Sequence, residues 1–459
     1  MSRGRLASVA ATLARWTIHE TQPMKYLAIL KDSLREAIDT KIIYFTLGLS
    51  CLLILLIGSV TFRPMSAQEE FESGTEMVNW LFSRIPEAGG LRFDVVDFQQ
   101  TNAAAEPWRG DYRFVYVIQT ANPVVLDEMK RKGGVPKPAE LESQFKRGTW
   151  IDQVKVTEEP AAKPSEVRYL VETKGTKVTD RRGWTHKPSL LFGALPLPTI
   201  FQGPLSGLLE FITDKLIGTF GAGVTMLIST IITAFFIPNM MRKGTIDLLL
   251  AKPIHRTTLL IYKFLGGLTF MFLNTVVIMV GIWLVLALQS GLWLNGLLVC
   301  VLIFTFQFAI FYSVSTLMAV LTRSPIVAIL TTVAAWAFLF GVGWGWRWVD
   351  TQRPEKIEER IEARTGMRQP RMQRDSDSPP NWLFLTADVL HLVTPHYKEL
   401  DALTTRVIRS DLVDPDSEQG KQLNTEIESI RWSESIIVTV LFIALMLALS
   451  CWRFATRDY

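Results

Sequence analysis

Long uncharged, mostly apolar stretches alternate with polar segments along this chain. A helix rises about 1.5 Å per residue, so roughly 20 apolar residues cross a hydrocarbon core about 30 Å thick. The charge-free stretches approach or exceed this length and predict six spanning helices. Their expected ranges are 42–62, 216–238, 264–288, 294–320, 324–346 and 435–452. The expected fold class is therefore a membrane all-α protein with six transmembrane helices.

The third and fourth spans are separated by a weak polar signal. No charged residue occurs between Phe264 and Thr322, a stretch too long for one membrane helix. The polar sequence Gln289-Ser290-Gly291 falls near its middle and predicts a tight turn there.

The polar segment 63–205, between the first and second spans, predicts a compact α+β domain. Alternation of apolar and polar residues favours strands, and one stretch favours a helix at Glu69 to Phe82. The expected strands are Leu91 to Phe98, Tyr112 to Thr120, Ile151 to Thr157 and Val167 to Thr173. No histidine or carboxylate pair here has the spacing of metal ligands or catalytic groups, and a solvated surface is the better interpretation.

Two further segments contain helical patterns outside the spans. Within the N-terminal segment 1–41, residues 24–41 predict an amphipathic helix in the membrane interface. Within the segment 347–434, an Arg/Glu-rich run from Glu355 to Arg374 predicts solvated structure. Apolar residues from Trp382 to Val393, and at helical spacing after Pro395, predict two surface helices.

The distribution of basic residues predicts the orientation. Lys and Arg concentrate in the N-terminal segment, in the loop 239–258 and in the tail 453–459. By the positive-inside rule these segments are cytoplasmic, whereas 63–205 and 347–434 are extracytoplasmic. We expect a multi-pass protein of the plasma (inner) membrane with both termini in the cytoplasm.

Composition and motifs argue against several classes of function. The formal net charge of +4 is small for 459 residues and does not favour nucleic-acid binding. The three cysteines, Cys51, Cys300 and Cys451, lie in apolar runs, so no disulfide, metal site or redox role is expected. The sequence contains no G-x-x-x-x-G-K-[ST], G-x-G-x-x-G, H-E-x-x-H, C-x-x-C or G-x-S-x-G motif. We expect no catalytic residue, cofactor site or metal site on this chain.

The loop between the second and third spans carries the most specific pattern. Residues 242–256 read RKGTIDLLLAKPIHR. Thr245 can cap a short helix, Asp247 suits its first turn, and Pro253 ends it. Its leucines give more apolar surface than a connector needs. Two uses fit this surface: docking on a partner protein, or insertion into the membrane interface.

The stretch from Pro238 to Gly267, with this loop and a Lys-Phe-Leu-Gly-Gly entry to the third span, resembles the permease subunits of type 2 ATP-binding-cassette (ABC) exporters. The order of elements along the chain is similar too. The resemblance implies a dimer, formed with a second copy or a paralogue, that lies in the lipid bilayer and works with a cytoplasmic ABC ATPase. That separate subunit would hold the ATP and Mg²⁺. The residues implied to dock on it are Gly244, Thr245, Asp247, Leu248, Leu249, Lys252, Pro253 and Arg256.

Two other classes of function fit part of the pattern. A membrane-anchored sensor or assembly protein would bind a partner through the outer domain and use the spans as a scaffold. A secondary transporter would use ion gradients, but it usually keeps ionisable residues inside its spans, and this sequence lacks them near the span centres.

Overall fold

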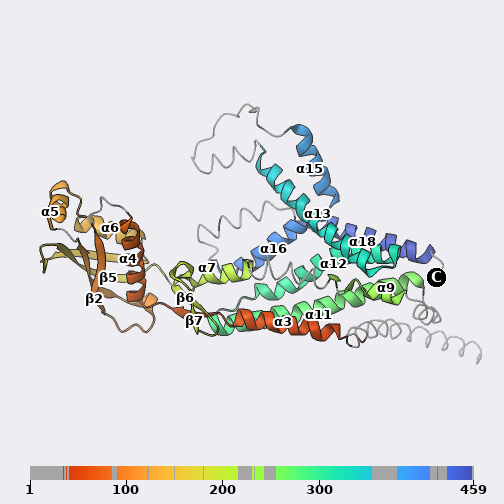
Figure 1. The fold of residues 1–459 in the computed structure, drawn as a ribbon, viewed down its shortest axis with the longest axis horizontal. Coiled ribbons are helices and arrows are strands. Elements are labelled where there is room, and N and C mark those ends of the chain that lie inside the picture. Colours follow the sequence, from red (N-terminus) through yellow and green to blue (C-terminus); the bar gives the residue numbers. More distant parts are fainter. Residues whose placement is uncertain are drawn as a thin grey trace, which may run out of the picture. The chain divides into compact units, whose positions relative to one another are not determined.

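The computed structural model describes residues 35, 38, 41–84, 90–120, 123–148, 150–178, 180–215, 230–231, 233–241, 255–353, 380–413, 421 and 432–456. The chain divides into two compact units (Figure 1). One is helical and comprises residues 1–57, 212–288 and 292–459. The other is strand-rich and comprises residues 58–211 and 289–291.

Among the described residues, four helices of the helical unit are long and apolar enough to cross a membrane. They are α11 (Arg256–Ser290), α12 (Gly296–Thr322), α13 (Pro325–Thr351) and α18 (Trp432–Thr456). Each overlaps one of the stretches expected to form the third to sixth spans. The unit also contains α3 (Ile42–Gly58), α9 (Phe236–Met240), α15 (Asn381–Val393) and α16 (Tyr397–Arg409).

The first two expected spans differ from the prediction or lie outside the described residues. Helix α3 ends at Gly58 rather than at residue 62, because the chain enters strand β1 (Thr61–Pro64). Most of the range 216–238 lies outside the described residues. So does most of the predicted interfacial helix 24–41, and a total of six spans stays a prediction.

Helix α12 is the central helix of its unit. In its most apolar stretch 67% of the residues are buried, against 17% in α13 and in α18. It packs against α13, α16 and α18. Helices α13 and α18 therefore present mainly apolar side chains outward, as helices that face lipid or another chain do.

The junction between α12 and α13 shows how local sequence ends one helix and starts the next. Arg323 follows α12 with a φ of 56°, a left-handed conformation that stops the helix. The Ser324 side chain then accepts a hydrogen bond from the Val327 N–H, and Pro325 occupies the first turn of α13.

The strand-rich unit contains an antiparallel four-stranded sheet in the order β2-β3-β5-β4. Its strands are β2 (Arg92–Gln100), β3 (Tyr112–Gln119), β4 (Ile151–Glu159) and β5 (Glu166–Thr176). Helices α4 (Ala67–Ser83), α5 (Pro123–Lys132) and α6 (Pro138–Gly148) accompany it. All four predicted strands and the predicted helix at Glu69 to Phe82 are confirmed. Helices α5 and α6 were not predicted.

A second, smaller sheet was also not predicted. It consists of β1, β6 (Thr185–Leu190), β7 (Leu195–Pro196) and β8 (Gly203–Pro204), with β6 pairing all three others. Short helix α7 (Leu205–Glu210) follows β8. The unit also contains three short 3₁₀ helices within the described residues, η2 (Pro107–Arg109), η3 (Arg181–Gly183) and η4 (Thr199–Phe201).

Candidate functional site

The loop 239–258, which is expected to couple the spans to an ATPase and is called the coupling loop below, has flanks that meet in one apolar cluster. Residues 234–241 enter the loop and α11 leaves it. Pro238 lies in α9, and the helix is interrupted by turn residues 234 and 235, as expected for a residue without an N–H. The apolar cluster consists of Ala234, Ile237, Met240, Met241, Leu259, Leu260, Ala319, Val320, Ala328 and Phe454.

This apolar cluster joins the loop to three other helices. Ala319 is near the end of α12, Ala328 is in the first turns of α13, and Phe454 is near the end of α18. Because buried side chains are close-packed, a displacement of either flank of the loop must shift these helix ends or open a void. The cluster can therefore transmit a movement of the loop to α12, α13 and α18.

Just after the loop, α11 packs closely against α12. Phe264 stacks on Tyr312 of α12, with ring centroids 4.9 Å apart. A Cβ added at Gly267 would lie 2.3 Å from Tyr312 Oη, so only glycine fits beside this ring. The Lys-Phe-Leu-Gly-Gly sequence thus supplies one stacking ring and the space for its partner.

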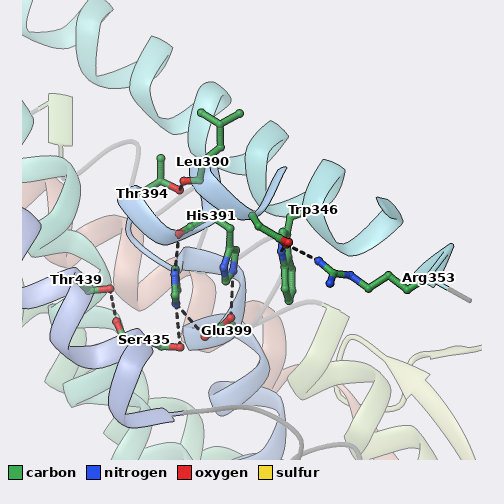
Figure 2. A network of polar contacts seen from close by, with 10 residues as sticks. Trp346, Arg353, Leu390, His391, Thr394, Glu399, Ser435 and Thr439 are labelled. Carbon is green, nitrogen blue, oxygen red and sulfur yellow. Dashed lines mark hydrogen bonds and ion pairs between the residues drawn. The ribbon is translucent and has the colours of Figure 1, made fainter. Parts of the chain in front are cut away.

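At the other ends of α13 and α18 lies a network of polar contacts (Figure 2). His391 Nε2 is 3.1 Å from Glu399 Oε1, and His396 Nδ1 is 3.2 Å from Glu399 Oε2. Ser435 Oγ, at the start of α18, lies 3.0 Å from His396 Nδ1. The network thereby ties α15 and α16 to α18.

Aromatic stacking extends the network to α13. The Trp346 ring stacks on His391 and His391 stacks on His396, each with centroids 3.9 Å apart. Trp346 Nε1 also donates a hydrogen bond to Asp388 Oδ1 over 3.2 Å, and Arg353 pairs with the same carboxylate. A column of three rings and a charged pair thus fix α15 on α13.

The contacts of His396 favour its protonated form. Its Nδ1 faces the Glu399 carboxylate, and its Nε2 lies 2.8 Å from the His391 carbonyl oxygen. A neutral imidazole has one N–H and cannot donate to both acceptors, whereas an imidazolium can. The geometry therefore describes a buried ion pair between His396 and Glu399.

The pKa values of this pair move in the directions that the geometry indicates. Burial alone lowers the pKa of His396. The hydrogen bond and charge of Glu399, the His391 carbonyl and the charge of Glu434 together raise that pKa above 6.5. Burial raises the pKa of Glu399, but hydrogen bonds from both histidines and their charge lower it to about 2. Each group therefore stabilises the charged form of the other.

His391, His396 and Glu399 each carry an atom that can bind a metal ion, and these nitrogen and oxygen atoms lie within 4.8 Å of one another. The two imidazole rings are stacked with only 20° between their planes. Nitrogen lone pairs lie in the ring plane, so those of stacked rings do not converge on one ion. The arrangement fits a hydrogen-bonded histidine–carboxylate pair better than a metal centre.

A cavity of about 720 Å³ adjoins the polar network. Besides Trp346 and both histidines, its described walls include the charged residues Asp350, Arg353, Asp388, Glu399 and Glu434. Arg353 pairs with Asp350 and Asp388, and His396 pairs with Glu399, so most of these charges are already compensated.

The model of the family described as ABC-2 family transporter protein matches residues 28–459 of the chain. The chain belongs to the ABC-2 transporter permease family. It is the multi-pass membrane subunit of an ABC transporter, a transport component that is not itself catalytic. A comparison with curated proteins found no match.

Among the predicted coupling residues of the permease, only Arg256 lies in the described part of the chain. It is the first residue of α11 and is half-buried. Gly244, Thr245, Asp247, Leu248, Leu249, Lys252 and Pro253 lie outside the described residues. Their role in docking stays a prediction, and so does the short helix expected there.

The polar network of the permease was not predicted. The available signal was that two of its five histidines, His391 and His396, fall close to Glu399 in a segment expected to be helical. Sequence spacing alone gives no hint of Trp346 and Ser435, which come from two other helices.

Proposed function

We propose that this permease is the membrane half of an exporter of the plasma membrane, driven by ATP hydrolysis on a separate cytoplasmic ATPase. In this proposal the loop 239–258 faces the cytoplasm and docks on that ATPase. Two copies, or one copy and a paralogue, form the transport path. The family match supports the transporter class, and the concentration of basic residues in the short loops supports the orientation.

The observation that carries the coupling proposal is the apolar cluster at the flanks of the loop. Met241 and Leu259 stand at opposite ends of the undescribed loop, yet both belong to that cluster. Ala328 and Phe454 belong to it as well. A partner that moved the loop would act on α11, α13 and α18 together, as a rigid-body mechanism of transport requires. A loop that served only as a connector would not need this arrangement.

Substitution of Leu249 tests docking. Leu249→Asp places an unpaired carboxylate at the proposed interface, which costs several kcal/mol and lowers association about a hundredfold or more. We expect the amount of ATPase recovered with the permease in mild detergent to collapse, while the amount of permease in the membrane stays normal. Ser324→Asp is the matched control, because it adds a carboxylate to another short loop at a helix N-cap that accepts Asp.

The outcomes separate the rival functions. Normal ATPase recovery with Leu249→Asp would overturn docking and would favour the alternative, in which the leucines of the loop insert into the membrane interface. Failure of any ATPase to accompany the wild-type chain would favour the sensor or secondary-transporter interpretation. If Leu249→Asp is lost from the membrane, Leu248→Asn tests docking instead. This substitution adds no charge, so it should weaken the recovery of the ATPase while the permease still inserts into the membrane.

A further inference from the structure

The hairpin between β6 and β7 carries an exposed apolar tip. Leu191 and Phe192 at the turn are 62% and 68% exposed. Ile200, in the neighbouring turn η4, is 86% exposed, the highest value among the large apolar residues described. A surface in contact with water alone gains nothing from such side chains, and contiguous apolar patches mark interaction sites.

Leu191 and Phe192 are also unusual residues for the backbone conformation of this turn. Leu191 and Phe192 have φ values of 53° and 57°, in the left-handed region, and Gly193 follows at 96°. Glycine and asparagine adopt this conformation most readily, whereas bulky residues adopt it at a cost. Both solubility and backbone conformation would favour other residues here. The apolar side chains therefore require a separate explanation.

The tip is hydrogen-bonded to a residue of its own unit that directly follows an apolar helix in the chain. The Phe192 N–H donates a hydrogen bond to the Ser59 carbonyl oxygen over 2.8 Å, and Ser59 directly follows the last residue of α3, Gly58. The Gln289 side chain donates to the Gly58 carbonyl oxygen, and Gln289 belongs to the last turn of α11. Gly58, Ser59, Gln289 and the hairpin all belong to the strand-rich unit, so the tip is fixed to the residues at which the chain leaves α3.

The length of α3 places this point at the depth of the membrane interface. Its 17 residues begin directly after the charged Lys41 and rise about 26 Å. The hydrocarbon core is about 30 Å thick. With α3 as the predicted first span and Lys41 at one boundary of the hydrocarbon, Gly58 reaches no farther than the other boundary, and the tip bound to Ser59 lies near it.

The chemistry of the whole segment suits lipid. From Pro188 to Leu209 the sequence contains no Asp, Glu, Lys or Arg, and the charged residues Lys187 and Glu210 flank it. Aromatic and aliphatic side chains are favourable in the interfacial region of a bilayer, while charged side chains there are costly unless they reach water.

We propose that Leu191, Phe192 and Ile200 insert into the bilayer interface at the end of α3. The partner of this surface is the lipid of the membrane that the chain spans. The inference goes beyond the proposed function and requires neither an ATPase nor a particular orientation of the chain.

Spin-label accessibility in the full-length permease tests the insertion. Cys51, Cys300 and Cys451 are first replaced by Ala or Ser. Single cysteines then carry the label at Phe192→Cys and Ile200→Cys, with Met77→Cys on α4, where the side chain is 71% exposed, as control. The protein is reconstituted in phosphatidylcholine/phosphatidylglycerol nanodiscs. Collision rates are measured with oxygen, which concentrates in lipid, and with a water-soluble nickel chelate.

We expect oxygen collisions to dominate at residues 192 and 200, and nickel collisions to dominate at residue 77. Dominant nickel collisions at 192 and 200 would show that the tip is in water and would overturn the proposal. Immobile labels hidden from both reagents would also overturn it, because they indicate contact with protein, either a second copy or a partner. The Ile200 variant lies outside the left-handed turn, so it decides the question even if Phe192→Cys disturbs the hairpin.

Discussion

Helices α13 and α18 are held at their two ends by different kinds of interaction. Near the predicted coupling loop, Ala328 and Phe454 pack in the apolar cluster with both flanks of that loop. At the opposite ends, Trp346 and Ser435 belong to a network of hydrogen bonds, charges and stacked rings. The same two helices thus connect an apolar junction with a polar one.

The contrast suggests a division of roles during transport. Apolar contacts are non-directional, so packed helices can slide by small amounts while they remain buried. Hydrogen bonds weaken steeply when their angles change, and a buried ion pair that loses one contact loses much of its compensation. We expect movement to enter at the apolar junction, and the polar network to keep α15 and α16 attached to the ends of α13 and α18.

The largest effect is expected from removing the carboxylate of the polar network. Glu399→Ala leaves the buried His396 imidazolium without its counter-charge. Breaking a buried pair in this way costs about 3–5 kcal/mol. We expect the lower end of this range, because His396 can release its proton. Thermal unfolding of the purified permease should show a clearly lower midpoint.

A surface carboxylate provides the control for this variant. Glu106 pairs with Arg109 in the strand-rich unit, and both side chains are largely exposed. Such pairs contribute about 0–1 kcal/mol, so Glu106→Gln should leave the midpoint almost unchanged. Equal effects of the two variants would contradict a buried ion pair at Glu399.

A smaller loss of stability is expected from overpacking on the apolar side. Gly267→Ala places a methyl group 2.3 Å from Tyr312 Oη, too close for the two helices to keep their positions. Overpacking of this kind costs about 1–3 kcal/mol. Thermal unfolding in detergent measures the loss, and ATPase recovery with the same variant reports whether the shift reaches the coupling loop.

Gly341→Ala is the matched control, because a Cβ there meets nothing within 4 Å. In a helix this change is neutral or stabilises by about 0.5–1 kcal/mol. Similar losses for both glycines would mean that the Phe264–Tyr312 stack does not restrict the helix packing.

The parts that the sequence predicted are those in which a local pattern is complete within one element. Alternation across Tyr112 to Thr120 or Val167 to Thr173 is sufficient to identify a strand, and the charge-free run from Phe264 to Thr322 is sufficient to identify two helices. The small sheet escaped prediction because β7 and β8 are two residues long and contain proline, so neither has a readable period.

Sequence reasoning failed in another way at the two junctions. The apolar cluster combines Ile237, Leu259, Ala328 and Phe454, and the polar network combines Trp346, His391, Glu399 and Ser435. His391 and Glu399 are close in the sequence, but the other members of both sets come from helices far apart along the chain, so no spacing connects them. The residues expected to dock on an ATPase, by contrast, follow from a local resemblance to a family, and except for Arg256 they lie outside the described residues.

The smallest predicted effect is a pH dependence of stability from the polar network. The pKa of His396 is raised from 6.5, so its contribution is complete below 6.5 and is lost as the pH rises through the folded pKa. The pKa of Glu399 is lowered from 4.5 to about 2, so its contribution is complete above 4.5 and is lost as the pH falls toward 2. The pair therefore stabilises most between pH 4.5 and 6.5.

Thermal unfolding at several pH values checks the direction of this pH dependence. The difference in midpoint between wild type and Glu399→Gln should be largest near about pH 5.5 and should shrink by about 2 °C or less as the pH rises through the raised pKa of His396. Neutral His396 still faces Ser435 Oγ through one nitrogen and the His391 carbonyl oxygen through the other, so part of the network survives. The difference between wild type and Glu106→Gln should not change over the same range. A difference at Glu399 that grew with pH would show that the network holds a neutral imidazole, and that the polar junction lacks the ion pair which distinguishes it from the apolar one.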